Sequence, residues 1–206
     1  MIGFYNYTVI LTYLGFASGI TGIALAMTGS ENVFWAILCL MLSGLCDAFD
    51  GRVARTKQRT DEEKRFGIQI DSLSDVVCFG VLPVAIGYCM GMTSPLHIIV
   101  MVIYALAALI RLAYFNVREE IKKENEPKMY HGLPVTSAAL LFPLCYGIKL
   151  IFPSCDIIYT IVMLLTGIAF VTDFTFKKPK FGAVLLMIAA GVIEIVLIIL
   201  ALYKVI

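Results

Sequence analysis

Seven long apolar runs divide this sequence, and they restrict its fold more than any other feature. They lie at about residues 7–27, 33–54, 70–92, 96–117, 134–152, 157–174 and 181–203. A membrane-spanning helix needs roughly 20 apolar residues, whereas barrel strands are shorter and alternate in polarity. A helix also satisfies its own backbone hydrogen bonds inside a bilayer. We therefore predict an all-α, polytopic membrane helix bundle with about seven transmembrane helices, within a range of six to eight.

The composition agrees with a membrane protein that has no separate soluble domain. Hydrophobic residues make up 60% of the chain and the mean hydropathy is +0.91, whereas soluble proteins are about half apolar. The formal net charge is only +1. We predict a single transmembrane domain over residues 1–206, with its motif-bearing core at about 8–140, surrounded by a lipid bilayer and with no nucleic-acid partner.

The basic residues are concentrated in alternate loops, which predicts the orientation. Lys and Arg cluster at 52–65, 118–128 and 177–180, and they are absent from 28–32, 93–95 and 153–156. Basic loops face the cytoplasm in multi-pass proteins. The pattern predicts a cytoplasmic N-terminus, an outward C-terminus for seven spans, and residence in the cytoplasmic membrane.

Four aspartates interrupt the apolar sequence between the second and third runs. They follow the pattern D-x2-D-G-x2-A-R and then G-x3-D-x3-D, as Asp47, Asp50, Asp71 and Asp75. Helical residues three or four apart share a face, so each pair projects together, and the polar loop 56–65 brings the two helices back antiparallel. Carboxylates in a membrane are costly, and four together repel one another unless cations lie between them. The pattern predicts a divalent metal site for Mg²⁺, Mn²⁺ or Ca²⁺, in which a shared carboxylate can bridge two ions.

Small residues and one arginine accompany the aspartates. Gly51, Ala54 and Gly67 leave room for the backbone or sugar of a ligand, and Arg55 lies one turn beyond Gly51. An arginine can bind phosphate oxygens in a bidentate way. A metal site, a phosphate-binding cation and a groove of small residues at a membrane surface together indicate a lipid-linked diphosphate substrate.

The run from Asp47 to Asp75 resembles the signature of the CDP-alcohol phosphotransferases, which are integral membrane enzymes. The matching positions are Asp47, Asp50, Gly51, Ala54, Arg55, Gly67, Asp71 and Asp75. The chain departs from the family pattern in its longer spacing between Arg55 and Gly67, in Gly15 where an Asn is frequent, and in Tyr114 where a second Arg is frequent. The stretches 70–83, 111–117 and 130–140 are most similar to the members that use serine as acceptor.

This resemblance implies a mechanism. Asp47, Asp50 and Asp71 would hold a pair of metal ions, and Asp75 would be the general base, also near one metal. The base would take the proton of the L-serine hydroxyl, which attacks the β-phosphorus of CDP-diacylglycerol and releases CMP. The resemblance also implies a homodimer with its active site at the cytoplasmic face.

The acceptor is the least determined part of this interpretation. Arg111 is our candidate for binding the serine carboxylate or a lipid phosphate, and Asn116 is a second candidate. Glycerol 3-phosphate or inositol phosphate are alternative acceptors, although an additional phosphate calls for more convergent Arg or Lys. A cation-coupled transporter is an alternative of another class. Transporters tend to repeat their broken helices in two halves, whereas this chain has a single aspartate cluster.

Overall fold

The computed structural model describes residues 3–121, 129–152, 157–177 and 181–203. Its α-helices are α1 (Ile10–Thr28), α2 (Val33–Ala54), α3 (Asp61–Asp75), α4 (Leu82–Cys89), α5 (Pro95–Ile121), α6 (Ala138–Ile151), α7 (Ile157–Val171) and α8 (Phe181–Leu202). A π-helix, η3 (Val76–Val81), joins α3 to α4, and short 3-10 helices are η1 (Tyr7–Val9), η2 (Ser30–Asn32) and η4 (Val135–Ser137). Two short antiparallel strands, β1 (Met129–His131) and β2 (Thr175–Lys177), pair Tyr130 with Phe176.

The predicted polytopic helix bundle is confirmed. Within the described residues, five helices are long and apolar enough to cross a membrane: Tyr7–Thr28, Ser30–Ala54, Asp61–Cys89, Pro95–Arg118 and Leu185–Leu202. Two shorter apolar helices, Val135–Ile151 and Ile157–Val171, coincide with the fifth and sixth predicted runs. Parts of the basic loops (122–128 and 178–180) and the neutral loop 153–156 lie outside the described residues.

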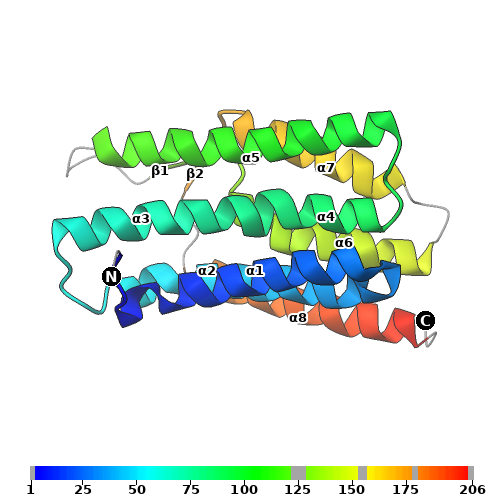
Figure 1. The fold of residues 1–206 in the computed structure, drawn as a ribbon, viewed down its shortest axis with the longest axis horizontal. Helices are drawn as coiled ribbons and strands as arrows, with labels where there is room; N and C mark the ends of the chain where they lie inside the picture. Colours follow the sequence, from blue (N-terminus) through cyan, green and yellow to red (C-terminus); the bar gives the residue numbers. More distant parts are fainter. Residues whose placement is uncertain (1–2, 122–128, 153–156, 178–180, 204–206) are drawn as a thin grey trace.

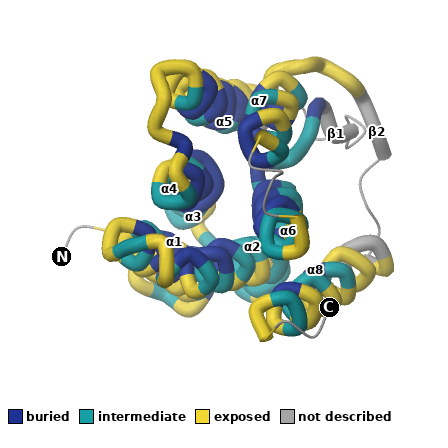
Figure 2. The backbone as a smooth tube through the Cα atoms, turned by 90° about the vertical axis from the view of Figure 1, so that its right-hand side faces the viewer, coloured by how far each residue is buried: buried dark blue, intermediate teal, exposed yellow. Residues whose placement is uncertain are grey.

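The helices run nearly parallel to one long axis, and the two ends of the chain lie at opposite ends of the bundle (Figure 1). Viewed end-on, the α3–α4 span lies between α1 and α5, and α6 lies between α2 and α7 (Figure 2). Helix α8 packs against α6 and α2 and exposes most of its apolar side chains. This arrangement brings α1, α2 and the α3–α4 span together, which positions the four aspartates.

The third span begins earlier than hydropathy predicts. We predicted a polar loop up to residue 65, but helix α3 already begins at Asp61. Thr60 caps this helix: its hydroxyl accepts from the Glu63 N–H, and the Glu63 carboxylate accepts from the Thr60 N–H. This reciprocal capping box stabilises a polar first turn. Asp71 and Asp75 consequently lie in the last turns of α3 and not at the start of a helix.

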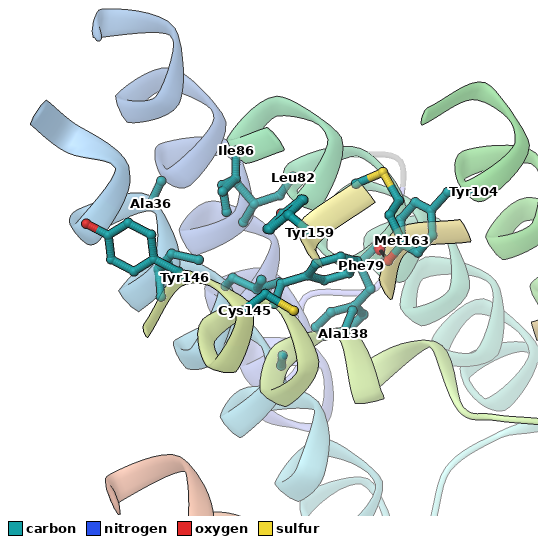
Figure 3. Close-up of a cluster of buried hydrophobic side chains, with 14 of the residues drawn as sticks. Ala36, Phe79, Leu82, Ile86, Tyr104, Ala138, Cys145, Tyr146, Tyr159 and Met163 are labelled. Carbon is teal, nitrogen blue, oxygen red and sulfur yellow. Dashed lines mark hydrogen bonds between the residues drawn. The ribbon is translucent and has the colours of Figure 1, made fainter. Parts of the chain in front are cut away.

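Buried aromatic and aliphatic side chains form the core, part of which Figure 3 shows. Tyr104 of α5 is fully buried, and its ring contacts Phe142 of α6 and Phe170 of α7 at centroid distances of 5.4 and 5.5 Å. Tyr159 of α7 contacts Phe142 at 4.9 Å. Buried tyrosines need a partner for the hydroxyl, and both of these find one in the third span, as described below.

Candidate metal and catalytic site

Three of the four predicted aspartates meet at one point. Carboxylate oxygens of Asp47 on α2 and of Asp71 and Asp75 on α3 all lie within 4.8 Å of one another. Asp75 is 8% exposed, whereas Asp47 and Asp71 are half-buried. The spacing of four residues on α3 and the antiparallel return of the chain from α2 produce this convergence, as the sequence predicted.

The cavity among these carboxylates has the size of an ion and lacks a basic side chain. Its volume is about 10 Å³, and its lining residues are Leu11, Thr12, Gly15, Ser43, Cys46, Asp47, Asp50, Asp71, Ser74, Asp75, Cys78 and Phe79. No Lys, Arg or His is among the described residues that line it. The described ion pairs, Lys57–Glu63 and Lys64–Asp61, use other acids. A hard divalent cation with oxygen ligands therefore fits this donor set.

Asp50 lines the same cavity and also contacts α1. Its Oδ2 accepts a hydrogen bond from the Thr12 hydroxyl at 3.3 Å. Thr12 is buried, and our sequence analysis missed it because a lone threonine in an apolar run carries no metal-binding signal. The hydrogen bond from α1 to the site therefore follows from the packing of α1 against α2, which the sequence alone does not show.

Gly15 joins α1 to both aspartate-bearing helices. Its carbonyl accepts from the Ser43 hydroxyl at 2.9 Å and from the Cys78 thiol at 3.4 Å. A Cβ at Gly15 would lie 3.2 Å from the Cβ of Cys46, so the position has little room for a side chain. The glycine that departs from the family pattern thus permits a close approach of α1 to the metal-binding residues.

The small residues of the motif are not among the residues that line the aspartate cavity. Gly51 is exposed, and nothing lies within 4 Å of the position that its Cβ would occupy. Arg55, at the C-terminal end of α2, is exposed, and Ala54 is half-buried. A Cβ at Gly67 would lie 3.2 Å from Nη1 of Arg59. This side of α2 leaves space for a ligand next to a cation.

The structure places Arg111 away from the aspartate cavity. Its side chain is 6% exposed and donates to the carbonyls of Phe170 and Gly132 at 3.2 and 3.3 Å. The guanidinium also lies 4.6 Å from the ring centroid of Phe115. Arg111 lines a separate cavity of about 180 Å³ between α5 and the end of α7. These contacts connect α5, α7 and the segment that precedes α6.

Asn116 lies next to the site through α3. Its Oδ1 accepts from the hydroxyl of Ser72, the residue after Asp71, at 2.9 Å. The contact joins the C-terminal part of α5 to the helix that carries two of the aspartates. The predicted roles of Arg111 and Asn116 in substrate binding remain predictions.

Comparison with known proteins gives a consistent set of relatives. The model of the CDP-alcohol phosphatidyltransferase family matches residues 5–205. A CDP-diacylglycerol–serine O-phosphatidyltransferase of Saccharomyces cerevisiae is 33% identical over 148 residues, which cover 69% of this chain and 52% of that protein. One of the same name from Helicobacter pylori is 35% identical over 118 residues, covering 56% and 47%.

An archaeal relative belongs to the same set. The archaetidylserine synthase of Methanothermobacter thermautotrophicus is 36% identical over 132 residues, covering 64% of this chain and 53% of that protein. The chain spans about half the length of the curated relatives it matches. Since the family match extends over nearly the whole chain and includes all four aspartates, this protein belongs to the CDP-alcohol phosphatidyltransferase family.

Proposed function

We propose that this protein is a phosphatidylserine synthase, which transfers the phosphatidyl group of CDP-diacylglycerol to the hydroxyl of L-serine and releases CMP. The proposal rests on the meeting of Asp47, Asp71 and Asp75 around one ion-sized cavity in a membrane helix bundle. The names of the relatives, two serine O-phosphatidyltransferases and an archaetidylserine synthase, support serine as the acceptor.

The aspartates would hold the divalent ions, two Mg²⁺ or Mn²⁺ by this proposal. Asp47, Asp50 and Asp71 would be the ligands of the pair, and Asp75 would also contribute to holding one ion. When bound, the ions would offset the negative charge of the diphosphate as its bond to CMP breaks. The charged side chains that line the cavity are all carboxylates, which supports this role, because carboxylates repel one another without cations.

The open side of α2 and the start of α3 would bind the CDP-lipid. Gly51 leaves space for the diphosphate or the sugar of the ligand. Ala54 and Gly67 add little or no side-chain volume next to it. Arg55 is exposed at the end of α2 and can bind phosphate oxygens in a bidentate way.

Asp75 would act as the general base. It takes the proton from the serine hydroxyl while the hydroxyl oxygen forms a bond to the β-phosphorus. The bond from that phosphorus to the bridging oxygen breaks, and the oxygen leaves with CMP. Asp75 is the most deeply buried of the clustered aspartates, which shields the proton transfer from bulk water. A positioned base contributes on the order of 10²–10⁴-fold to the rate.

Serine brings less negative charge than a phosphorylated acceptor. Glycerol 3-phosphate and inositol phosphate would each bring a further dianionic group, which calls for more convergent Arg or Lys than the single carboxylate of serine does. We further propose a homodimer in the cytoplasmic membrane, with the aspartates at the cytoplasmic face, as the loop charges predict.

The test is CMP release by the purified protein in lipid nanodiscs with CDP-diacylglycerol and Mg²⁺ or Mn²⁺. Serine, glycerol 3-phosphate and inositol phosphate are compared as acceptors, with Asp75→Asn as the inactive variant. Asp61→Asn is the matched control, because Asp61 lies on the same helix and is paired with Lys64 at the surface. Metal-dependent release with serine alone, lost only in Asp75→Asn, supports the proposal. Release with another acceptor alone overturns the choice of serine, and no release with any acceptor overturns the reaction.

A further inference from the structure

The helix that carries Asp71 and Asp75 changes its geometry directly after Asp75. Residues Val76–Val81 form a π-helix between α3 and α4. Pro83 explains the change. In a regular α-helix, residue 83 would donate its N–H to the carbonyl of Phe79, but proline has no N–H. The carbonyl of Phe79 therefore cannot accept this α-helical hydrogen bond, and a π-turn occupies this part of the span.

A side chain from another helix supplies a donor to this carbonyl. The hydroxyl of Tyr104 on α5 donates to the carbonyl of Phe79 at 2.5 Å. Tyr104 is fully buried and Phe79 is 1% exposed, so water is excluded from this bond. Both residues belong to the central cluster of Figure 3.

Neighbouring helices fix the position of Tyr104. Its ring packs between Phe142 of α6 and Phe170 of α7. A Cβ at Gly167 would lie 3.2 Å from the Cα of Tyr104, so the backbones of α5 and α7 are in close contact there. The hydroxyl therefore has a fixed position toward the π-turn.

The opposite side of the π-turn packs on α1. The Cys78 thiol donates to the carbonyl of Gly15 at 3.4 Å, and a Cβ at Gly19 would lie only 2.6 Å from the Cys78 sulfur. On the α5 side, a Cβ at Gly80 would contact Ala108 at 3.5 Å. The π-turn is thus enclosed between α1 and α5, and Asp75 is the residue immediately before it.

We propose that Tyr104 is a positioning residue for the aspartate site. The Tyr104 hydroxyl donates to the Phe79 carbonyl and so holds the π-turn at residues 76–81. A fixed π-turn keeps the Asp75 carboxylate directed toward those of Asp47 and Asp71. If the π-turn moved by one residue along the helix, the side chains beside it would rotate by about 100° about the helix axis. Without the hydroxyl, this buried carbonyl loses the hydrogen bond from α5, and the loss of a buried hydrogen bond is costly enough to shift the turn. The inference rests on the proposed function, since it assigns a purpose to the same carboxylates.

The experiment compares Tyr104→Phe with Tyr159→Phe. Tyr159 is a matched control: it is 3% exposed, packs on Phe142, and donates its hydroxyl to the carbonyl of Pro83 at 2.8 Å, beyond the π-turn. Each change removes one buried hydroxyl bonded to the same span. Binding of Mn²⁺ without substrates is measured from the loss of the free-ion EPR signal, and kcat and KM are measured by CMP release.

We expect Tyr104→Phe to weaken Mn²⁺ binding by about 10-fold or more, as is typical for residues that orient metal ligands, and to lower kcat more than it raises KM. Tyr159→Phe should leave Mn²⁺ affinity unchanged even if its melting temperature falls equally. Unchanged Mn²⁺ affinity in folded Tyr104→Phe, or an equal loss in both variants, overturns the proposal. Mn²⁺ binding is measured without substrates. If the parent protein did not catalyse the serine reaction, the proposed function would fail, but the binding experiment would still test the role of Tyr104.

A second variant keeps the proposal testable if Tyr104→Phe does not fold. Gly167→Ala retains the hydroxyl but places a methyl group 3.2 Å from the Cα of Tyr104, so the backbone that carries the tyrosine must shift to make room. Weaker Mn²⁺ binding in folded Gly167→Ala supports the proposal, and unchanged binding overturns it.

Discussion

The Thr12 hydroxyl donates a hydrogen bond to Oδ2 of Asp50 at 3.3 Å, and this contact joins the first helix to the aspartate site. Thr12 cannot be a strong metal ligand, but it orients one of the four carboxylates from outside the D-x2-D motif.

Thr12→Val removes this hydrogen bond at nearly constant volume. Hydrogen bonds to charged groups contribute about 1.5–3 kcal/mol, so we expect a clear loss of kcat and weaker metal activation. Thr21→Val on the same helix is the control, because the exposed Thr21 bonds only to the carbonyl of Ala17. Steady-state CMP release at varied Mn²⁺ measures both. Equal behaviour of the two variants would contradict the orienting role.

Asp50→Asn and Asp71→Asn should differ in their metal stoichiometry. Asp71 belongs to the group of three carboxylates whose oxygens lie within 4.8 Å, and Asp50 does not. We expect Asp50→Asn to retain one Mn²⁺ site and Asp71→Asn to weaken both, with activity falling at least about 100-fold in each. Calorimetric titration with Mn²⁺ gives the stoichiometry. Loss of all binding in Asp50→Asn would show that the two ions are not separable in this way.

Glu63→Gln should destabilise the junction between α2 and α3. The Glu63 carboxylate accepts from the Asn6 side chain at 2.9 Å, from Lys57 at 3.2 Å and from the Thr60 N–H at 3.0 Å. A glutamine amide has one acceptor oxygen in place of two, so it cannot accept from Asn6, Lys57 and the Thr60 N–H together. The loss of a hydrogen bond costs about 1 kcal/mol, so the melting temperature should fall. The exposed neighbour Glu62→Gln is the control. An equal fall of the melting temperature in both variants would mean that the loss of one negative charge, and not the loss of the Glu63 hydrogen bonds, destabilises the protein.

Arg111→Lys distinguishes a structural from a substrate-binding role. An ammonium group cannot reproduce the two directed bonds to the carbonyls of Phe170 and Gly132. We expect lower thermal stability with an unchanged KM for serine. A raised KM for serine at unchanged stability would instead support the predicted contact with the serine carboxylate.

The sequence predicted the spans and the aspartate cluster well, because both depend on local periodicity. Hydropathy identified the apolar runs, and the spacing of Asp71 and Asp75 placed them on one helix face. Family membership also removes the transporter alternative. The start of α3 was predicted too late, since hydropathy does not register the polar first turn that Thr60 and Glu63 stabilise.

Contacts between distant segments could not be predicted in this way. Pro83 indicates an irregular helix, but nothing in its neighbourhood identifies Tyr104 as the residue that satisfies Phe79. The contacts of Arg111 similarly come from Gly132 and Phe170, which lie in segments that the sequence does not place next to α5. Helix packing decides these partners.

The length of the third span has a consequence for how the reactants arrive. The 29 residues from Asp61 to Cys89 extend about 44 Å at 1.5 Å per residue, whereas the hydrocarbon layer is about 30 Å thick. Counted back from Cys89, a span of that thickness would end near residue 70, which would put Asp71 and Asp75 close to the boundary with the headgroups. In the proposed reaction, a lipid donor anchored in that leaflet would then reach the carboxylates by lateral diffusion, without leaving the bilayer. The water-soluble acceptor and the nucleotide product would instead enter and leave from the aqueous side, so the two routes would be separate.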